Sequence, residues 1–304
     1  MSGKSAPPRD VRRRSGLVLL LAAGLVLIAA GVFAGVGAAE PRVIEPSSAA
    51  RDAGTSSNGA QESVKVRTTH GMVKGLKVTA DGYPTYQTFF GIRYAQSAAP
   101  PNRWLPPKPA NWTGTFDATK FGPMAEQSCI NGYGSMDPEK MNEDSLRLNI
   151  WTPAADGKKR PVIVYIHGGG YTLGDPANPH YNGKRFAQEG VVYVDLSYRL
   201  GPFGFMDVST IPGAPAKYKG SGNLGLLDQR MALRFIRDNI SRFGGDPDRV
   251  TLSGGSAGAW STTIHMALPE SNKLFQRAIA VAGSPQCGDL DWAAKVTKMT
   301  MEAA

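Results

Sequence analysis

Two nearly continuous apolar runs limit what this chain can fold into. The segments "RPVIVYIHGGG", residues 160–170, and "GVVYVDLSYRLG", residues 190–201, are rich in Val and Ile. Runs of this kind are typical of strands that are buried on both faces of a parallel sheet. They therefore predict the central strands of an α/β protein.

Helical and strand patterns alternate in the second half of the chain. Residues 226–240, "LLDQRMALRFIRDNI", place four apolar residues at helical intervals and precede a pair of glycines. Residues 248–255 then predict a strand, residues 256–268 a helix, and residues 276–284 another strand. Strand, helix and strand in succession, with buried strands, predict a doubly wound α/β architecture.

The first half carries strand signals of a different kind. Residues 64–78, "VKVRTTHGMVKGLKV", alternate around a glycine turn and predict an antiparallel hairpin. Residues 86–95 and 146–153, "YQTFFGIRYA" and "LRLNIWTP", predict further strands. We expect a folded domain over residues 63–304.

The N-terminal sequence indicates an export segment. A basic start is followed by an uncharged apolar run over residues 16–39 that ends in small residues. This order predicts a signal peptide over residues 1–39, and an uncleaved membrane anchor is the alternative. Either outcome makes the rest of the chain secreted or extracytoplasmic. Residues 40–62, rich in Pro, Ser, Ala and Gly without an apolar period, predict a disordered linker.

The net charge of +9 does not indicate a nucleic-acid partner. Five basic residues and one acidic residue precede residue 15, which leaves 29 basic and 24 acidic residues of mixed order in the remainder. When the first 14 residues are left out, the sequence contains no cluster of basic residues of the kind that binds nucleic acid. Any contact with a membrane is expected only through an uncleaved N-terminal segment.

The stretch "VTLSGGSAGAW" contains a G-x-S-x-G pattern from Gly254 to Gly258. On a tight turn from strand to helix, the serine side chain stands clear of the sheet, and the flanking glycines avoid clashes with the neighbouring strand and helix. Ser256 is therefore a candidate nucleophile. The alternative is a glycine-rich connecting turn with an incidental serine.

A run of three glycines follows the strand predicted over residues 160–166. Such a run costs conformational entropy on folding, which indicates that the backbone at this position serves a specific role. We expect the N–H groups of Gly169 and Gly170, with that of Ala257, to form an oxyanion hole, in which one donor is worth about 3 kcal/mol in a transition state. A plain flexible loop is the alternative.

Seven segments together resemble the type B carboxylesterases, the esterase and cholinesterase branch of the α/β-hydrolases. They are "FFGIRYA", "RWLPP", "NEDSLRLNIWTP", "VIVYIHGGGY", "SYRLGPFGF", "GNLGLLDQRMALRFIRDNISRFGGDPDRVTLSGGSAGAW" and "LFQRAIAVAGS", in the family's order between about residues 63 and 285. The resemblance implies an α/β-hydrolase fold with an N-terminal hairpin. It also implies a small-molecule ester substrate, an acyl-enzyme on Ser256, and an oxyanion hole from Gly169, Gly170 and Ala257.

The resemblance further implies two buried ion pairs with a structural role, Arg103 with Glu143 and Arg199 with Asp228. No cofactor is implied, and the four histidines and two cysteines form no cluster with metal-ligand spacing.

Two positions and one loop depart from the family pattern. Gly255 replaces the usual glutamate before the serine, and residues 129–142, "CINGYGSMDPEKMN", lack the tryptophan with which cholinesterases hold a quaternary ammonium. An acetylcholine-like substrate is therefore disfavoured. Ser145 stands where the family has a cysteine, so Cys129 lacks its expected partner; a disulfide with Cys287 and two separate thiols both remain open.

No histidine of this chain is predicted to activate Ser256. In this fold the triad order is serine, acid, histidine, and after Ser256 only His265 follows, nine residues along the same predicted helix and about 13 Å away at 1.5 Å per residue. We therefore expect the acid and the base in sequence beyond Ala304, and little activity from this chain alone. A non-catalytic binding module and a decayed gene product are the alternatives.

Overall fold

A computed structural model describes residues 62–80, 82–127, 138–284 and 289–302. The predicted export segment and linker up to residue 61, and both cysteines, lie outside the described residues. In the described stretches, no helix is long and apolar enough to cross a bilayer.

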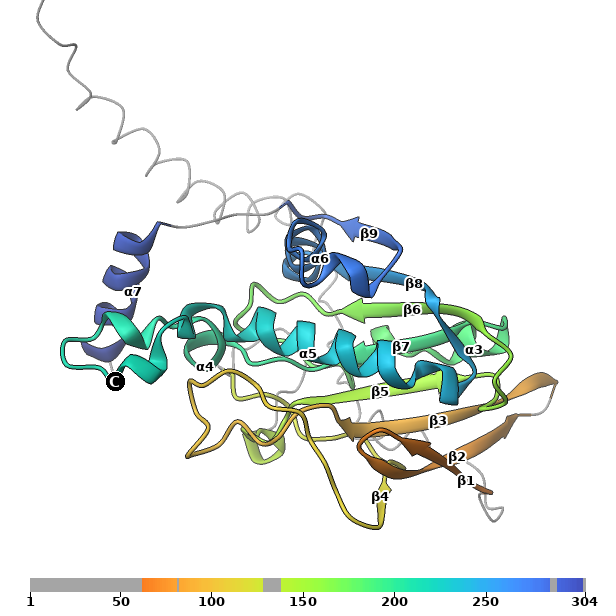
Figure 1. Cartoon of the computed structure of the whole chain (residues 1–304). Helices are drawn as coiled ribbons and strands as arrows, with labels where there is room; N and C mark the ends of the chain where they lie inside the picture. The colour runs from red at the N-terminus through yellow and green to blue at the C-terminus, as the bar shows by residue number, and fades with distance from the viewer. Residues whose placement is uncertain (1–61, 81, 128–137, 285–288, 303–304) are drawn as a thin grey trace, which may run out of the picture. The chain divides into compact units, whose positions relative to one another are not determined.

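One mixed sheet organises the described residues (Figure 1). Its strands run in the order β1-β2-β3-β5-β7-β6-β8-β9, and β4 pairs with β2. The strands are β1 (Ser63–Thr68), β2 (Gly71–Ala80), β3 (Tyr83–Arg93), β4 (Thr115–Asp117), β5 (Arg147–Thr152), β6 (Arg160–Ile166), β7 (Val192–Leu196), β8 (Gly245–Gly255) and β9 (Arg277–Val281).

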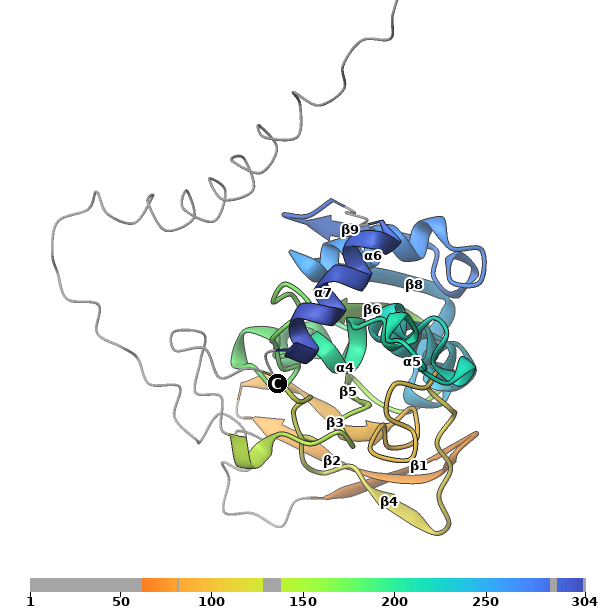
Figure 2. The same ribbon diagram turned by 90° about the vertical axis from the view of Figure 1, so that its left-hand side faces the viewer.

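Helices cover both faces of the sheet, with α3 on one face and α5 and α6 on the other (Figures 1 and 2). The helices are α3 (Lys184–Gln188), α4 (Gly201–Phe205), α5 (Leu224–Asn239), α6 (Ala257–Ala267) and α7 (Leu290–Glu302). Short 3-10 turns are η1 (Pro138–Lys140), η2 (Pro179–Tyr181), η3 (Val208–Thr210), η4 (Ala216–Tyr218), η5 (Ser221–Asn223), η6 (Ile240–Phe243) and η7 (Asn272–Leu274).

The buried apolar runs form the parallel part of the sheet, as predicted. Strand β6 pairs in parallel with β7 and β8, and β8 pairs in parallel with β9. Every residue of β7 is buried, and so are Val162, Val164 and Ile166 of β6. The antiparallel part comprises β1, β2, β3 and β5, and begins with the predicted hairpin. The fold is that of the α/β-hydrolases, with β7, β6, β8 and β9 parallel to one another in one half of the sheet and the short β4 paired in parallel with β2 in the other.

The outermost parallel strand has an apolar edge. Strand β9 pairs with β8 on one side, and its Ile279 and Val281 are about half exposed, at 49% and 56%.

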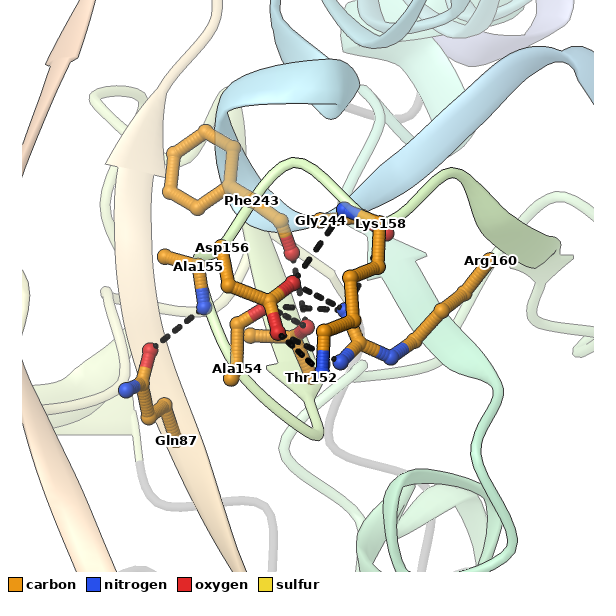
Figure 3. A network of polar contacts seen from close by, with 9 residues as sticks. All are labelled: Gln87, Thr152, Ala154, Ala155, Asp156, Lys158, Arg160, Phe243 and Gly244. Atoms are coloured by element: carbon orange, nitrogen blue, oxygen red, sulfur yellow. Dashed lines mark hydrogen bonds and ion pairs between the residues drawn. The ribbon is translucent and has the colours of Figure 1, made fainter.

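The connection between β5 and β6 is tied to its surroundings by a polar network (Figure 3). The Arg160 guanidinium donates to both carboxylate oxygens of Asp156, at 2.6 and 2.8 Å. The backbone N–H of Arg160 donates to the carbonyl oxygen of Gly244 at 2.9 Å, and the Thr152 hydroxyl donates to that of Phe243 at 2.7 Å. The network thereby joins the β5–β6 connection to the end of η6, where the chain enters β8.

The hydrogen bonds from Arg160 lower the pKa of Asp156 to about 2. Because the folded-state pKa lies below the unfolded one, this pair stabilises the fold above about pH 4, and its contribution is lost as the pH falls through about 2. We expect Asp156→Asn to lower the free energy of unfolding near pH 7 by about 0.5–1 kcal/mol. The difference from the parent chain should shrink between pH 4 and pH 2 in urea titrations. Asp248→Asn, at an exposed aspartate, is the control and should cost less.

His265, on α6, contacts α5 and the turn that precedes η7. Its side chain is fully buried, with Nε2 3.0 Å from Oε1 of Gln229 and Nδ1 3.0 Å from Oγ of Ser271. Because an amide oxygen only accepts, Nε2 donates to Gln229 and Nδ1 accepts from the Ser271 hydroxyl. The ring therefore joins two helices in its neutral form. Burial, followed by the nearby charge of Arg230, lowers the pKa of His265 to about 4.

This buried histidine predicts a loss of stability in mild acid. The unfolded chain takes up the proton near pH 6.5, whereas the folded chain resists it until about pH 4, so the free energy of unfolding falls with pH between these values. We expect the parent chain to lose about 2 kcal/mol between pH 7 and pH 5 from this residue. In urea titrations His265→Gln should show a flatter pH dependence. His180→Gln, at an exposed histidine, should behave as the parent; equal slopes for all three would refute the assignment.

Candidate active site

Ser256 occupies the single-residue turn between β8 and α6. Its backbone is in an unusual conformation, with φ 54° and ψ −120°, and the residue is exposed. A non-glycine residue with positive φ costs about 1–3 kcal/mol and persists only where its surroundings impose it. The serine that the sequence predicts as a nucleophile therefore stands at the carboxyl end of the parallel strands, clear of the sheet.

Flanking glycines impose this turn. A Cβ on Gly254 would lie 2.2 Å from the carbonyl oxygen of Gly258, and a Cβ on Gly258 would lie 2.0 Å from that of Ile166 at the end of β6. Neither distance is sterically possible for a carbon atom. The predicted reason for both glycines, a clash with the neighbouring strand and helix, agrees with the observed packing.

The glycine run after β6 lies directly against Ser256. A Cβ on Gly168 would come within 2.7 Å of the Gly255 carbonyl oxygen and 3.2 Å of the Ser256 Cβ. Gly169 and Gly170 both have positive φ, 115° and 62°, and the carbonyl oxygen of Gly169 accepts from the N–H groups of Thr172 and Leu173 at 3.0 and 3.1 Å. The run is thus an ordered turn, in contrast to the flexible-loop alternative.

Three backbone donors at this turn have no acceptor among the described residues. They are the N–H groups of Gly169, Gly170 and Ala257, the residues predicted for an oxyanion hole. Ala257 is the first residue of α6, a helix of eleven residues whose positive end therefore faces the same edge. Free donors from two adjacent loops can stabilise a negative oxygen beside Ser256.

Tyr171 joins the two loops and was not singled out from the sequence. Its hydroxyl lies 3.1 Å from Oγ of Ser261, on α6, and its ring lies 5.8 Å from that of Trp260. Its backbone has φ 61°, and its carbonyl oxygen accepts from the N–H of Gly201 at 2.7 Å. The only sequence signal was an aromatic residue directly after the glycines, which does not specify a partner.

Among the described residues, no hydrogen bond or ring contact joins any of the four histidines to Ser256. Both ring nitrogens of His265 are engaged by Gln229 and Ser271, so the predicted inability of His265 to reach the serine agrees with the structure, although the residue is buried and does not face solvent. His167 is buried, stacks on Tyr198, and has its pKa lowered by that burial.

The other two histidines lie elsewhere in the fold. His70 packs against Phe235, with ring centroids 4.9 Å apart, and His180 lies exposed in η2. Over the residues that the structure describes, no group of three or more His, Cys, Asp or Glu side chains is arranged to bind a metal ion.

The two predicted ion pairs are both present but differ in burial. Arg199 and Asp228 are almost fully buried, and the guanidinium donates to both carboxylate oxygens at 2.7 and 2.8 Å. Arg103 also pairs with Glu143, but 38% of its side chain is exposed, so the expectation of a buried pair was wrong there. The Arg103 side chain stays at the surface, 5.6 Å from the centre of the Phe203 ring.

The model of the carboxylesterase family matches residues 61–300. An acetylcholinesterase of Bungarus fasciatus is 40% identical over 232 residues, which cover 73% of this chain and 37% of that protein. A para-nitrobenzyl esterase of Bacillus subtilis is 40% identical over 222 residues, or 72% of this chain and 43% of that protein.

Solved structures give the same assignment. A carboxylesterase of Geobacillus stearothermophilus has a TM-score of 0.69 and 39% identity, covering 78% of this chain and 47% of its own. A thermophilic PNB esterase has a TM-score of 0.69 and 38% identity, covering 78% and 48%. The chain thus spans less than half the length of these relatives. With the family model matching nearly all of the described residues, this chain belongs to the carboxylesterase family.

Proposed function

We propose that this chain carries the nucleophile and the oxyanion hole of a serine hydrolase that cleaves small-molecule carboxylic esters. The observation that carries the proposal is the exposed Ser256 on a strained turn, in contact with a glycine run whose N–H groups have no acceptor among the described residues. A glycine-rich turn with an incidental serine would have no reason to keep that strain.

The chemistry assigns each group a step. The Ser256 hydroxyl oxygen attacks the ester carbonyl carbon while its proton passes to a base, and the carbonyl oxygen becomes negative. The N–H groups of Gly169, Gly170 and Ala257 donate to that oxygen. The alcohol then leaves with a proton, and an acyl-serine remains. In the second step water attacks the acyl carbon and releases the acid.

A base for the serine proton is not identified among the described residues. No hydrogen bond or ring contact joins any of the four histidines to Ser256, and we propose that this chain by itself turns over esters very slowly. A serine hydroxyl without a base is a poor nucleophile at neutral pH.

The substrate and setting remain part of the proposal. Residues 129–142 contain no tryptophan, which argues against a quaternary ammonium ester, although one relative is named an acetylcholinesterase. We propose uncharged carboxylic esters, no nucleic-acid partner, and a protein exported by residues 1–39 or anchored by them.

Added imidazole should supply the base. We expect para-nitrophenyl acetate to acylate the 304-residue chain only slowly. Imidazole should raise the acylation rate at least tenfold, because it can accept the proton of the Ser256 hydroxyl. Intact-protein mass spectrometry would report the acetyl group and its position. Ser256→Ala should remove both the acetyl group and the rate increase above the imidazole background. Acylation that persists in Ser256→Ala would exclude this serine, and fast acylation without imidazole would exclude a missing base.

The oxyanion hole gives a separate test on the same assay. A Cβ on Gly169 would lie 2.0 Å from the Leu173 carbonyl oxygen, so Gly169→Ala has to displace the donor loop. We expect a loss of about 10²–10³-fold in the imidazole-dependent acylation rate. Gly213 has a positive φ of 81° with open space around it, so Gly213→Ala imposes the same kind of backbone strain without a clash. Equal rates for the two variants would count against the assigned donors.

A further inference from the structure

A pocket lies on the face of the sheet that α3 covers. It has a volume of about 70 Å³ and is bounded by β2, β3, β5 and the segment 176–182, and we call it the β3–β5 pocket. In the sheet order, β7 and β6 separate β5 from β8, the strand that leads to Ser256. The pocket is therefore distinct from the candidate active site, and an inference about it does not depend on the proposed function.

The floor and wall of the β3–β5 pocket are aromatic. Tyr86 and Phe90 from β3, Trp151 from β5, and Phe121 line it. The rings of Phe90 and Phe121 are stacked with centroids 4.2 Å apart, and that of Phe90 lies 4.8 Å from Trp151 at an angle of 59°. Although Tyr86, Phe90 and Trp151 are only 7%, 5% and 2% exposed, the exposed parts of these rings line the pocket and can contact a further ring.

The rim offers neutral hydrogen-bonding groups in fixed positions. Oδ1 of Asn178 accepts from the N–H of His180 at 3.0 Å, and Oδ1 of Asn182 accepts from that of Lys184 at 2.9 Å. These bonds fix each carboxamide by its oxygen and leave its NH₂ group without an acceptor among the described residues. The Thr88 hydroxyl, within the pocket, likewise has no partner there. None of the described residues that line the pocket carries a charge.

The size of the β3–β5 pocket fits one ring. A single water molecule needs about 10–15 Å³ measured in this way, so 70 Å³ corresponds to the space of about five water molecules. That space suits a single six-membered ring with one small substituent. We propose that the β3–β5 pocket binds a small uncharged aromatic molecule that bears one hydroxyl group, with the ring against Trp151 and Phe90 and the hydroxyl towards Thr88 and the two asparagines.

Phenol is the probe for the test, with cyclohexanol and benzoate as its matched competitors. We expect saturable binding of phenol with Kd in the millimolar range, by calorimetry and by saturation-transfer NMR on the full chain. Cyclohexanol, which keeps the hydroxyl and loses the aromatic ring, should bind at least fivefold more weakly. Benzoate should bind at least tenfold more weakly, because a carboxylate would lose its hydration against a lining without charge.

Variants locate the site. Ala177 is buried and lines the pocket, so Ala177→Leu should reduce phenol affinity at least tenfold by filling the space, whereas Ala216→Leu, at an exposed alanine in η4, should leave it unchanged. Thr88→Val keeps the side-chain shape, tests the hydroxyl without filling the pocket, and should cost several-fold. Ser256→Ala should bind phenol as the parent does, which separates this pocket from the active site.

Several outcomes would overturn the proposal. They are no saturable phenol binding up to tens of millimolar, undiminished affinity in both Ala177→Leu and Thr88→Val, and cyclohexanol binding equal to phenol. Benzoate binding tighter than phenol would also overturn it. That result would mean that Lys184 and Arg185, whose charges lie 5.7 and 4.8 Å from the ring of nearby Tyr83, attract an anion instead.

Discussion

Direct contact between two backbones at the carboxyl edge of the sheet sets the position of everything else at this site. The turn after β8 lies against the end of β6 so closely that Gly258 faces the Ile166 carbonyl oxygen and Gly168 faces that of Gly255. No side chain separates the two loops, because a single Cβ at either glycine would push them apart. The parallel register of Ile166 with Gly254 brings these glycines level with one another.

This contact links the strain at Ser256 to the packing of the core. A positive φ at a serine is unfavourable in isolation, and here it is maintained between β6 and β8, whose apolar residues Val162, Val164, Ile166, Val250 and Leu252 are fully buried. The N–H of Ser256 donates to the carbonyl oxygen of Val281 at 2.9 Å, so β9 also fixes the turn. Tyr171 then holds the glycine run to α6 through Ser261. The turn that carries these backbone N–H groups is consequently fixed by contacts with three strands, and an oxyanion hole built from them, as proposed, would need little reorganisation.

The sequence predicted the sheet and the turn well because their signals are local. Apolar runs indicate buried strands, and a serine between glycines on a strand-to-helix turn indicates its own geometry. Contacts between segments far apart in the sequence were not predictable in this way. The hydrogen bond from Ser261 to Tyr171 joins residues 90 positions apart, and the engagement of His265 by Gln229 joins residues 36 apart. The partial exposure of Arg103 was also not predicted, because a sequence motif indicates which residue forms the ion pair but not how deeply the pair is buried.

The described residues separate the two demands of acyl transfer. Stabilising a negative oxygen requires only oriented backbone donors, which a glycine run and a helix N-terminus can supply from a single half of a sheet. Moving the serine proton requires a titratable side chain at hydrogen-bond distance, and no described contact joins any of the four histidines to Ser256. Under the proposed function, Ser256 and the three backbone donors would meet the first demand, while the described contacts identify no group for the second. A diffusible base separates the two demands, because it can take the serine proton and leaves the backbone geometry unchanged.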